Sequence, residues 1–175
     1  MKKAVFLDRD GVLNRSFIKN GKPFPPFDLN NVEILEGVKD AIIALKKENW
    51  LVIVITNQPD VARNKASKQN VEKINSYLKL ILQFDEIFTC YHDDIDACEC
   101  RKPKPGMLVA ASKKNNIDLN NSYMVGDRWS DIEAGNNVGC KTIFIDYNYN
   151  EKKPQNYNHI TKSLKEAAKI ILKNG

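Results

Sequence analysis

The chain has 175 residues, of which 42% are hydrophobic and 28% are charged, and its formal net charge is +5. This composition is typical of a globular protein with one core, so we expect a single domain over residues 1–175. No apolar segment approaches the roughly 18 residues of a membrane helix, no export signal is visible, and no basic cluster is interleaved with aromatic residues. We therefore expect a cytoplasmic monomer that binds neither membranes nor nucleic acids.

The first predicted element is a buried strand, a short apolar run that stops at Asp8, Arg9, Asp10 and Gly11. In open α/β sheets the carboxyl ends of the strands face the ligand crevice. A carboxylate there can attack phosphorus, and a second acid two residues on can transfer the leaving-group proton. Taken alone, Asp-x-Asp-Gly is equally compatible with an ordinary turn or a calcium loop, although the residues that follow lack the acids of an EF-hand.

Strand and helix patterns then alternate along the chain. Residues 15–35 are polar and rich in Gly and Pro, so we expect an irregular loop that is a candidate ligand contact. Short apolar runs predict five strands, at residues 4–7, 51–55, 86–90, 122–125 and 142–145. Helical periodicity predicts five helices, at about residues 37–49, 67–81, 105–115, 130–139 and 163–172. The alternation predicts a Rossmann-like α/β fold, a parallel sheet with helices on both faces.

Two of these helices carry a predicted capping box. Ser130 and Glu133 have the required spacing, so we expect the fourth helix to start there with Asp131 in its first turn. Ser163 and Glu166 repeat the pattern at the start of the last helix.

Polar groups follow four of the strands, and parallel strands bring such groups to one edge of the sheet. In chain order they are Asp8 with Asp10, Thr56, Lys102, and Asp127 with Asp131. Their order and type resemble the four motifs of the haloacid dehalogenase superfamily of aspartyl phosphohydrolases, over roughly residues 4–146. Because no large insertion follows Asn14 or separates the second and third strands, the resemblance implies a capless member with an open site.

The resemblance also implies a role for each motif residue. The phosphoryl transition state spreads negative charge over three oxygens, which need fixed positive partners. Asp8 would be the nucleophile and Asp10 the general acid and base, while Thr56 and Lys102 would hold the phosphoryl group. A catalytic Mg²⁺ would be bound by Asp8, the Asp10 backbone carbonyl and Asp127. Asp131 would orient a metal-bound water or Lys102.

A second cluster, Cys90, His92, Cys98 and Cys100, follows the third strand. Three thiolates and one imidazole can form a closed tetrahedral zinc site, and alternating positions in an extended chain point to the same side. In a chain without an export signal such a cluster indicates a metal rather than disulfides. We expect a structural Zn²⁺ that fixes the loop before Lys102; the alternative is a set of unlinked thiols beside a surface histidine.

This cysteine loop, running into Cys-Arg-Lys-Pro-x-Pro-Gly-Met, resembles the branch that contains phosphatases of heptose bisphosphates and of histidinol phosphate. The motif residues Thr56-Asn57-Gln58 and Ala62-Arg63 fit the heptose enzymes. Pro59-Asp60, Asn64 and Arg128 depart from their usual Ser-Gly, Gly and Lys, and the short cysteine loop is closer to the histidinol-phosphate enzymes.

The resemblance implies a phosphorylated sugar as the partner, with heptose 1,7-bisphosphate hydrolysed at C7. Histidinol phosphate or another small phosphate monoester is the alternative, and a non-catalytic phosphosugar-binding protein is the alternative outside the enzymes. The predicted substrate contacts are Asn57, Gln58, Arg63, Arg101 and Arg128. The three arginines suit bidentate capture of a second phosphate.

Overall fold

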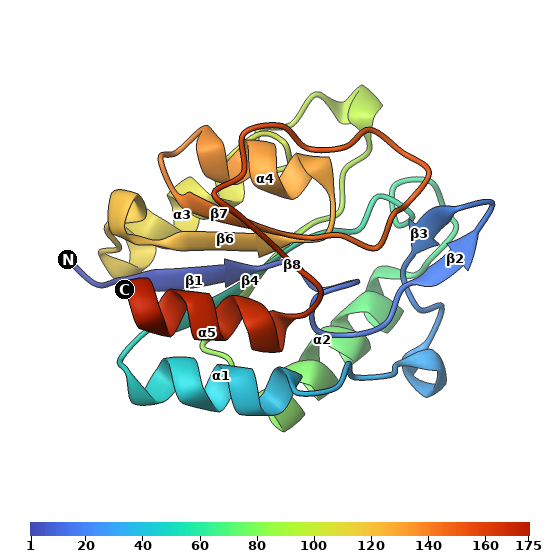
Figure 1. The fold of residues 1–175 in the computed structure, drawn as a ribbon. Coiled ribbons are helices and arrows are strands. Elements are labelled where there is room, and N and C mark those ends of the chain that lie inside the picture. Colours follow the sequence, from blue (N-terminus) through green and yellow to red (C-terminus); the bar gives the residue numbers. More distant parts are fainter.

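The structure, a computed structural model, describes residues 1–175. Six strands form one parallel sheet in the order β5-β4-β1-β6-β7-β8 (Figure 1). They are β1 (Ala4–Leu7), β4 (Leu51–Asn57), β5 (Glu86–Cys90), β6 (Tyr123–Gly126), β7 (Lys141–Ile145) and β8 (His159–Thr161). The predicted parallel α/β fold is confirmed.

Helices cover both faces of this sheet (Figure 1). One face packs against α1 (Val38–Lys47), α2 (Lys68–Leu82) and α5 (Leu164–Asn174), and the other against α3 (Gly106–Asn115) and α4 (Trp129–Asn136). Because side chains alternate along a strand, Val5 and Leu7 of β1 enter the first core, whereas Ala4 and Phe6 enter the second. The all-apolar runs of the central strands therefore reflect burial on both sides.

The helix starts follow the predicted caps at Ser67 and Ser163, but neither predicted capping box forms as expected. At α5 the Ser163 hydroxyl accepts the Glu166 N–H at 3.2 Å, whereas the Glu166 carboxylate accepts the Lys162 N–H rather than that of Ser163. The Ser67 hydroxyl accepts a hydrogen bond from the Asn70 N–H at the start of α2. The box predicted at Ser130 is wrong, because α4 already begins at Trp129 and the Asp131 carboxylate accepts the Arg128 N–H at 3.0 Å. An ionised carboxylate at this position accepts a hydrogen bond from an otherwise unpaired N–H, and its negative charge is stabilised by the positive end of the helix dipole.

The segment predicted as an irregular loop contains a hairpin, so that prediction is wrong. Strands β2 (Phe17–Lys19) and β3 (Lys22–Phe24) pair antiparallel around Asn20 and Gly21, and a short 3₁₀ helix, η1 (Leu29–Asn31), follows. Both turn residues have positive φ, 53° and 72°, which is the backbone that Asn-Gly favours in a two-residue hairpin. The hairpin stands at the carboxyl edge of the sheet (Figure 1).

The sixth strand of the sheet, β8, was not predicted from the sequence. Residues 146–158, which we call the strap, leave β7, cross the carboxyl edge of the sheet toward the hairpin, and return to β8 (Figure 1). The Asn150 N–H donates to the Gly21 carbonyl oxygen at 2.7 Å, which ties the strap to the hairpin turn. With only three residues, β8 is too short for a recognisable apolar alternation.

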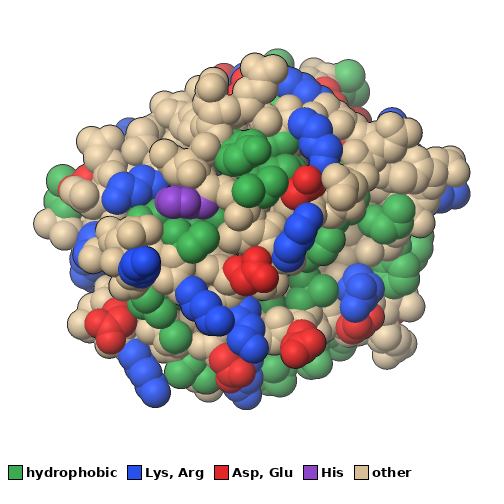
Figure 2. All heavy atoms as spheres, in the orientation of Figure 1, with side chains coloured by type: hydrophobic (Ala, Val, Ile, Leu, Met, Phe, Trp, Pro, Cys, Tyr) green, Lys and Arg blue, Asp and Glu red, His purple; other side chains and the backbone are tan.

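On the face shown in Figure 2, basic and acidic side chains are interspersed over α1 and α5 rather than gathered into one basic surface. None of the helices is both long and apolar enough to cross a membrane.

Candidate active site

The strand order places the residues that follow β1, β4 and β6 next to one another. The Lys102 ammonium lies at their centre, with Nζ 2.8 Å from Asp8 Oδ1, 2.6 Å from Asp131 Oδ1 and 2.7 Å from the Ile55 carbonyl oxygen. Lys102 and Asp131 are only 3% and 1% exposed, and Asp8 is 7% exposed. A buried ammonium with three acceptors is fixed in place, so it presents its charge at one point.

Three carboxylates, from Asp8, Asp127 and Asp131, each offer an oxygen within 4.8 Å of the others. Burial raises the pKa of Asp8 to about 6, with Asp131 adding to the rise and Lys102 opposing it. Burial, together with Asp8 and Asp131, also raises the pKa of Asp127 well above its usual value. Buried Asp127 Oδ1 has no hydrogen-bond partner. Clustered acids with a free oxygen fit a hard divalent cation such as Mg²⁺.

Asp10 is held at the edge of this cluster by four donor nitrogen atoms from three side chains. Both of its oxygens accept bonds from the buried Arg9 guanidinium, at 2.9–3.2 Å. Asn14 and Gln58 donate one further bond each, at 2.9 and 2.8 Å, and the same Gln58 nitrogen lies 2.9 Å from the Thr56 hydroxyl. The side chains predicted to transfer protons and to bind phosphate are thus joined in one network.

A cleft opens above the cluster and is lined by residues from the hairpin, the turn after β4 and the start of α4. Its lining includes the predicted contacts Asn57, Arg63 and Arg128, but neither Gln58 nor Arg101. The Asn57 side chain also accepts the Lys102 N–H at 3.1 Å and donates to its carbonyl oxygen at 3.0 Å. It therefore fixes the backbone that carries Lys102.

Each of the three predicted phosphate-binding arginines is paired with an acid. Arg63 Nε lies 2.7 Å from Asp93 Oδ2, Arg101 Nε lies 2.7 Å from Asp94 Oδ1, and Arg128 Nε lies 2.9 Å from Glu151 Oε1. These acids were not predicted as partners from the sequence. Lys22 of β3 also lines the cleft, and it forms no ion pair.

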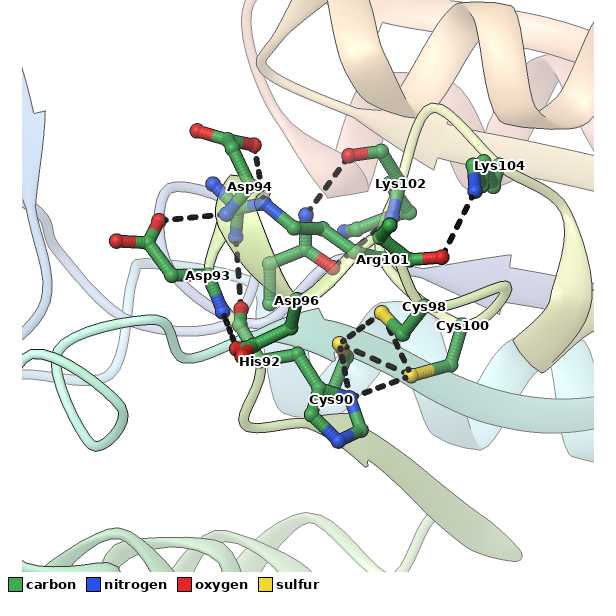
Figure 3. Close-up of polar contacts among 12 residues, drawn as sticks. Cys90, His92, Asp93, Asp94, Asp96, Cys98, Cys100, Arg101, Lys102 and Lys104 are labelled. Atoms are coloured by element: carbon green, nitrogen blue, oxygen red, sulfur yellow. Dashed lines mark hydrogen bonds and ion pairs between the residues drawn. The ribbon is translucent and has the colours of Figure 1, made fainter.

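The four predicted zinc ligands converge beside the cleft, with their sulfur and nitrogen atoms directed at one another (Figure 3). Cys100 Sγ lies 3.0 Å from Cys90 Sγ, 3.4 Å from Cys98 Sγ and 3.2 Å from His92 Nδ1. Tetrahedral bonds of about 2.0–2.3 Å separate ligand atoms by roughly 3.5–3.8 Å, so a small adjustment would admit one Zn²⁺. No disulfide links the cysteines.

Three residues of this site were not identified from the sequence. Arg9 is fully buried and lies between the two motif acids, a position that could have marked it. Lys22 could be placed near the site only by recognising the Asn20-Gly21 hairpin, which was not predicted. Tyr149 donates a hydrogen bond to Asp127 at 2.9 Å from the strap, a segment without periodicity that gave no signal.

Comparisons with known proteins agree with this geometry. A family model described as "HAD-hyrolase-like" matches residues 99–167. A Pasteurella multocida protein named D-glycero-beta-D-manno-heptose-1,7-bisphosphate 7-phosphatase is 33% identical, over 98% of this chain and 97% of its own. A Campylobacter jejuni protein named as the corresponding alpha-heptose enzyme is 32% identical, over 94% of this chain and 92% of its own.

A solved structure gives the same result. It is a D,D-heptose 1,7-bisphosphate phosphatase from B. bronchiseptica complexed with magnesium and phosphate, which has a TM-score of 0.84 and 27% identity and covers 99% of both chains. The four motifs, the two clusters and relatives of this identity and coverage lead to one assignment. The chain belongs to the heptose 1,7-bisphosphate 7-phosphatase family of the haloacid dehalogenase-like hydrolases.

Proposed function

We propose that this protein is a magnesium-dependent phosphatase that hydrolyses D-glycero-D-manno-heptose 1,7-bisphosphate at C7 through an aspartyl phosphate. The supporting observation is the buried Lys102 ammonium, which bonds to Asp8 beneath an open cleft. A fixed positive charge beside a carboxylate at a strand end suits attack on a phosphate monoester, because both the nucleophile and the developing equatorial charge are stabilised.

In the first step an Asp8 oxygen forms a bond to phosphorus while the bond from phosphorus to the C7 oxygen breaks. Asp10, at the cleft lining, gives its proton to that leaving oxygen. In the second step Asp10 takes a proton from a water, whose oxygen attacks phosphorus and releases Asp8 and inorganic phosphate. Lys102 and the Thr56 hydroxyl contact the phosphoryl oxygens during both steps.

The acid cluster is the proposed Mg²⁺ site, with ligands from Asp8, the Asp10 carbonyl oxygen and Asp127. Bound there, the ion would neutralise charge on the phosphoryl oxygens. Asp131 keeps Lys102 in position rather than binding the ion, since Lys102 and the Arg128 N–H occupy its two oxygens.

The cysteine cluster is the proposed structural Zn²⁺ site. Its role is to hold the loop that delivers Lys102, because the last zinc ligand precedes Lys102 by only two residues. We infer a cytoplasmic location, because cysteines that serve as metal ligands rather than in disulfides are typical of a reducing compartment.

The distal phosphate would bind at the cations that line the cleft, Lys22, Arg63 and Arg128. Each guanidinium carries five donors, so an arginine that holds a carboxylate retains N–H groups for a phosphate. The test is a comparison of kcat/KM for both anomers of heptose 1,7-bisphosphate, heptose 7-phosphate and histidinol phosphate. We expect the bisphosphate to be preferred. Faster hydrolysis of histidinol phosphate, whose amine is cationic, would contradict the proposal.

A further inference from the structure

The strap contacts three consecutive residues that follow β6. The Tyr149 hydroxyl donates to Asp127 Oδ2 at 2.9 Å, and Glu151 pairs with Arg128. The Lys152 ammonium lies 4.2 Å from the centre of the Trp129 ring. A segment that begins 19 positions after Asp127 therefore holds this strand end, and Tyr149, 22 positions downstream, is its contact with a carboxylate of the acid cluster.

The two oxygens of Asp127 have different surroundings. Oδ2 accepts the Tyr149 hydroxyl and lies so close to the Gly11 backbone that a β-carbon there would be only 1.9 Å away. Oδ1 is buried and has no hydrogen-bond partner. The carboxylate is therefore fixed with one oxygen engaged by the protein and the other free for a ligand.

The tyrosine is itself constrained. Its ring stacks on Tyr147 with centroids 5.5 Å apart and an interplanar angle of 25°. The neighbouring Asn150 N–H is bonded to the hairpin at Gly21. Because the ring is stacked within the strap and the next residue is bonded to the hairpin, the Tyr149 hydroxyl has little freedom to follow a rotating carboxylate.

We propose that Tyr149 is a positioning residue that orients Asp127 so that Oδ1 alone binds the divalent cation. The inference rests on the proposed function, because it requires the acid cluster to hold Mg²⁺. Without the phenol, the buried carboxylate can rotate and exchange its oxygens. Metal binding must then also fix the carboxylate orientation, which reduces the net free energy of binding. Loss of such an outer hydrogen bond typically weakens metal binding by about 10–100-fold.

The test compares Tyr149→Phe with Tyr147→Phe. The matched control removes a hydroxyl from the stacked partner, which lies next but one in the chain; of the two tyrosines only Tyr149 donates a hydrogen bond to Asp127. Mg²⁺ affinity is measured by calorimetry on metal-free protein in the absence of substrate. We expect about a 10–100-fold rise in Kd for Tyr149→Phe and less than a twofold change for Tyr147→Phe. At saturating Mg²⁺, kcat should stay within about threefold of the wild type.

Mg²⁺-induced stabilisation provides a second measurement. Each variant is compared with its own metal-free form, so a general loss of stability cancels, and the rise in Tm at a fixed Mg²⁺ concentration should shrink only for Tyr149→Phe. Equal Mg²⁺ affinity in wild type and Tyr149→Phe overturns this inference and leaves the proposed function standing. A wild-type protein that binds no Mg²⁺ overturns both.

Discussion

Lys102 Nζ lies 2.8 Å from Asp8 Oδ1, although 94 positions separate the two residues in the chain. The same ammonium also holds Asp131, so it neutralises part of an otherwise repulsive carboxylate cluster. The pair is formed only when the loop after β5 packs against the ends of β1 and β4.

Replacing Asp8, the proposed nucleophile, tests the covalent mechanism. Asp8→Asn should lower kcat by several orders of magnitude, because a nearly isosteric amide cannot attack phosphorus. The fold should persist, since Lys102 keeps its bonds to Asp131 and Ile55. Steady-state turnover of a generic phosphate ester and the circular dichroism spectrum check the two halves of the prediction. Activity comparable to the wild type would remove the aspartyl-phosphate intermediate.

Metal removal should affect stability in a pH-dependent way. Burial raises the pKa of Asp8 to about 6 in the metal-free protein, above the value of roughly 3.9 in an unfolded chain. The stabilisation by the neutral carboxyl is therefore complete below about pH 4 and is lost as the pH rises through 6. Mg²⁺ requires the ionised form, so it should raise Tm more at pH 8 than at pH 5. Thermal unfolding with Mg²⁺ and with a chelator checks this; an equal gain at both pH values would contradict it.

Zinc should be present at one ion per chain and should support both stability and activity. Removing a ligand, as in Cys98→Ser, is expected to lower zinc content, Tm and kcat together, because the loop before Lys102 loses its anchor. The matched control is Cys140→Ser, which removes the thiol outside the cluster and should leave zinc content unchanged. The measurement is elemental analysis of protein purified without added metal. A zinc content near zero, with all thiols titratable in the native protein, would refute the zinc site.

Substrate preference should depend on the cations that line the cleft. Arg63→Ala should reduce kcat/KM for the bisphosphate by about tenfold to a hundredfold and barely change it for a monophosphate, since one charge-assisted contact contributes roughly 1.5–3 kcal/mol. Lys22→Ala should act in the same direction. Arg15→Ala is the control, because Arg15 pairs with Glu33 outside the cleft. An equal loss on both substrates would contradict a distal-phosphate role.

The parts of this site that could be predicted from the sequence are those on buried strands. Apolar runs located Asp8, Thr56 and Asp127 at strand ends, and parallel pairing then brought them together. Lys102 lies on a loop, and its position followed from motif order rather than from any strand.

The remaining features depend on contacts between polar segments, which leave no periodic pattern. The pairing of Arg63 with Asp93 and of Tyr149 with Asp127 joins residues 30 and 22 positions apart through loops. Nothing in residue type or spacing distinguishes these partners from ordinary surface side chains. The hairpin at Asn20-Gly21 is different, because the turn signal was present and was not read as a hairpin.

The position of β1 between β4 and β6 also bears on how the enzyme matures during synthesis. Asp8 leaves the ribosome first, but β6 and Asp127 are made more than 110 residues later, and β1 cannot complete its pairing before then. Such non-local pairing is formed late in folding. A nascent chain therefore carries the proposed nucleophile without Lys102, Asp127 or Asp131 until those residues have been translated, and the site is complete only once Asp131 has been made.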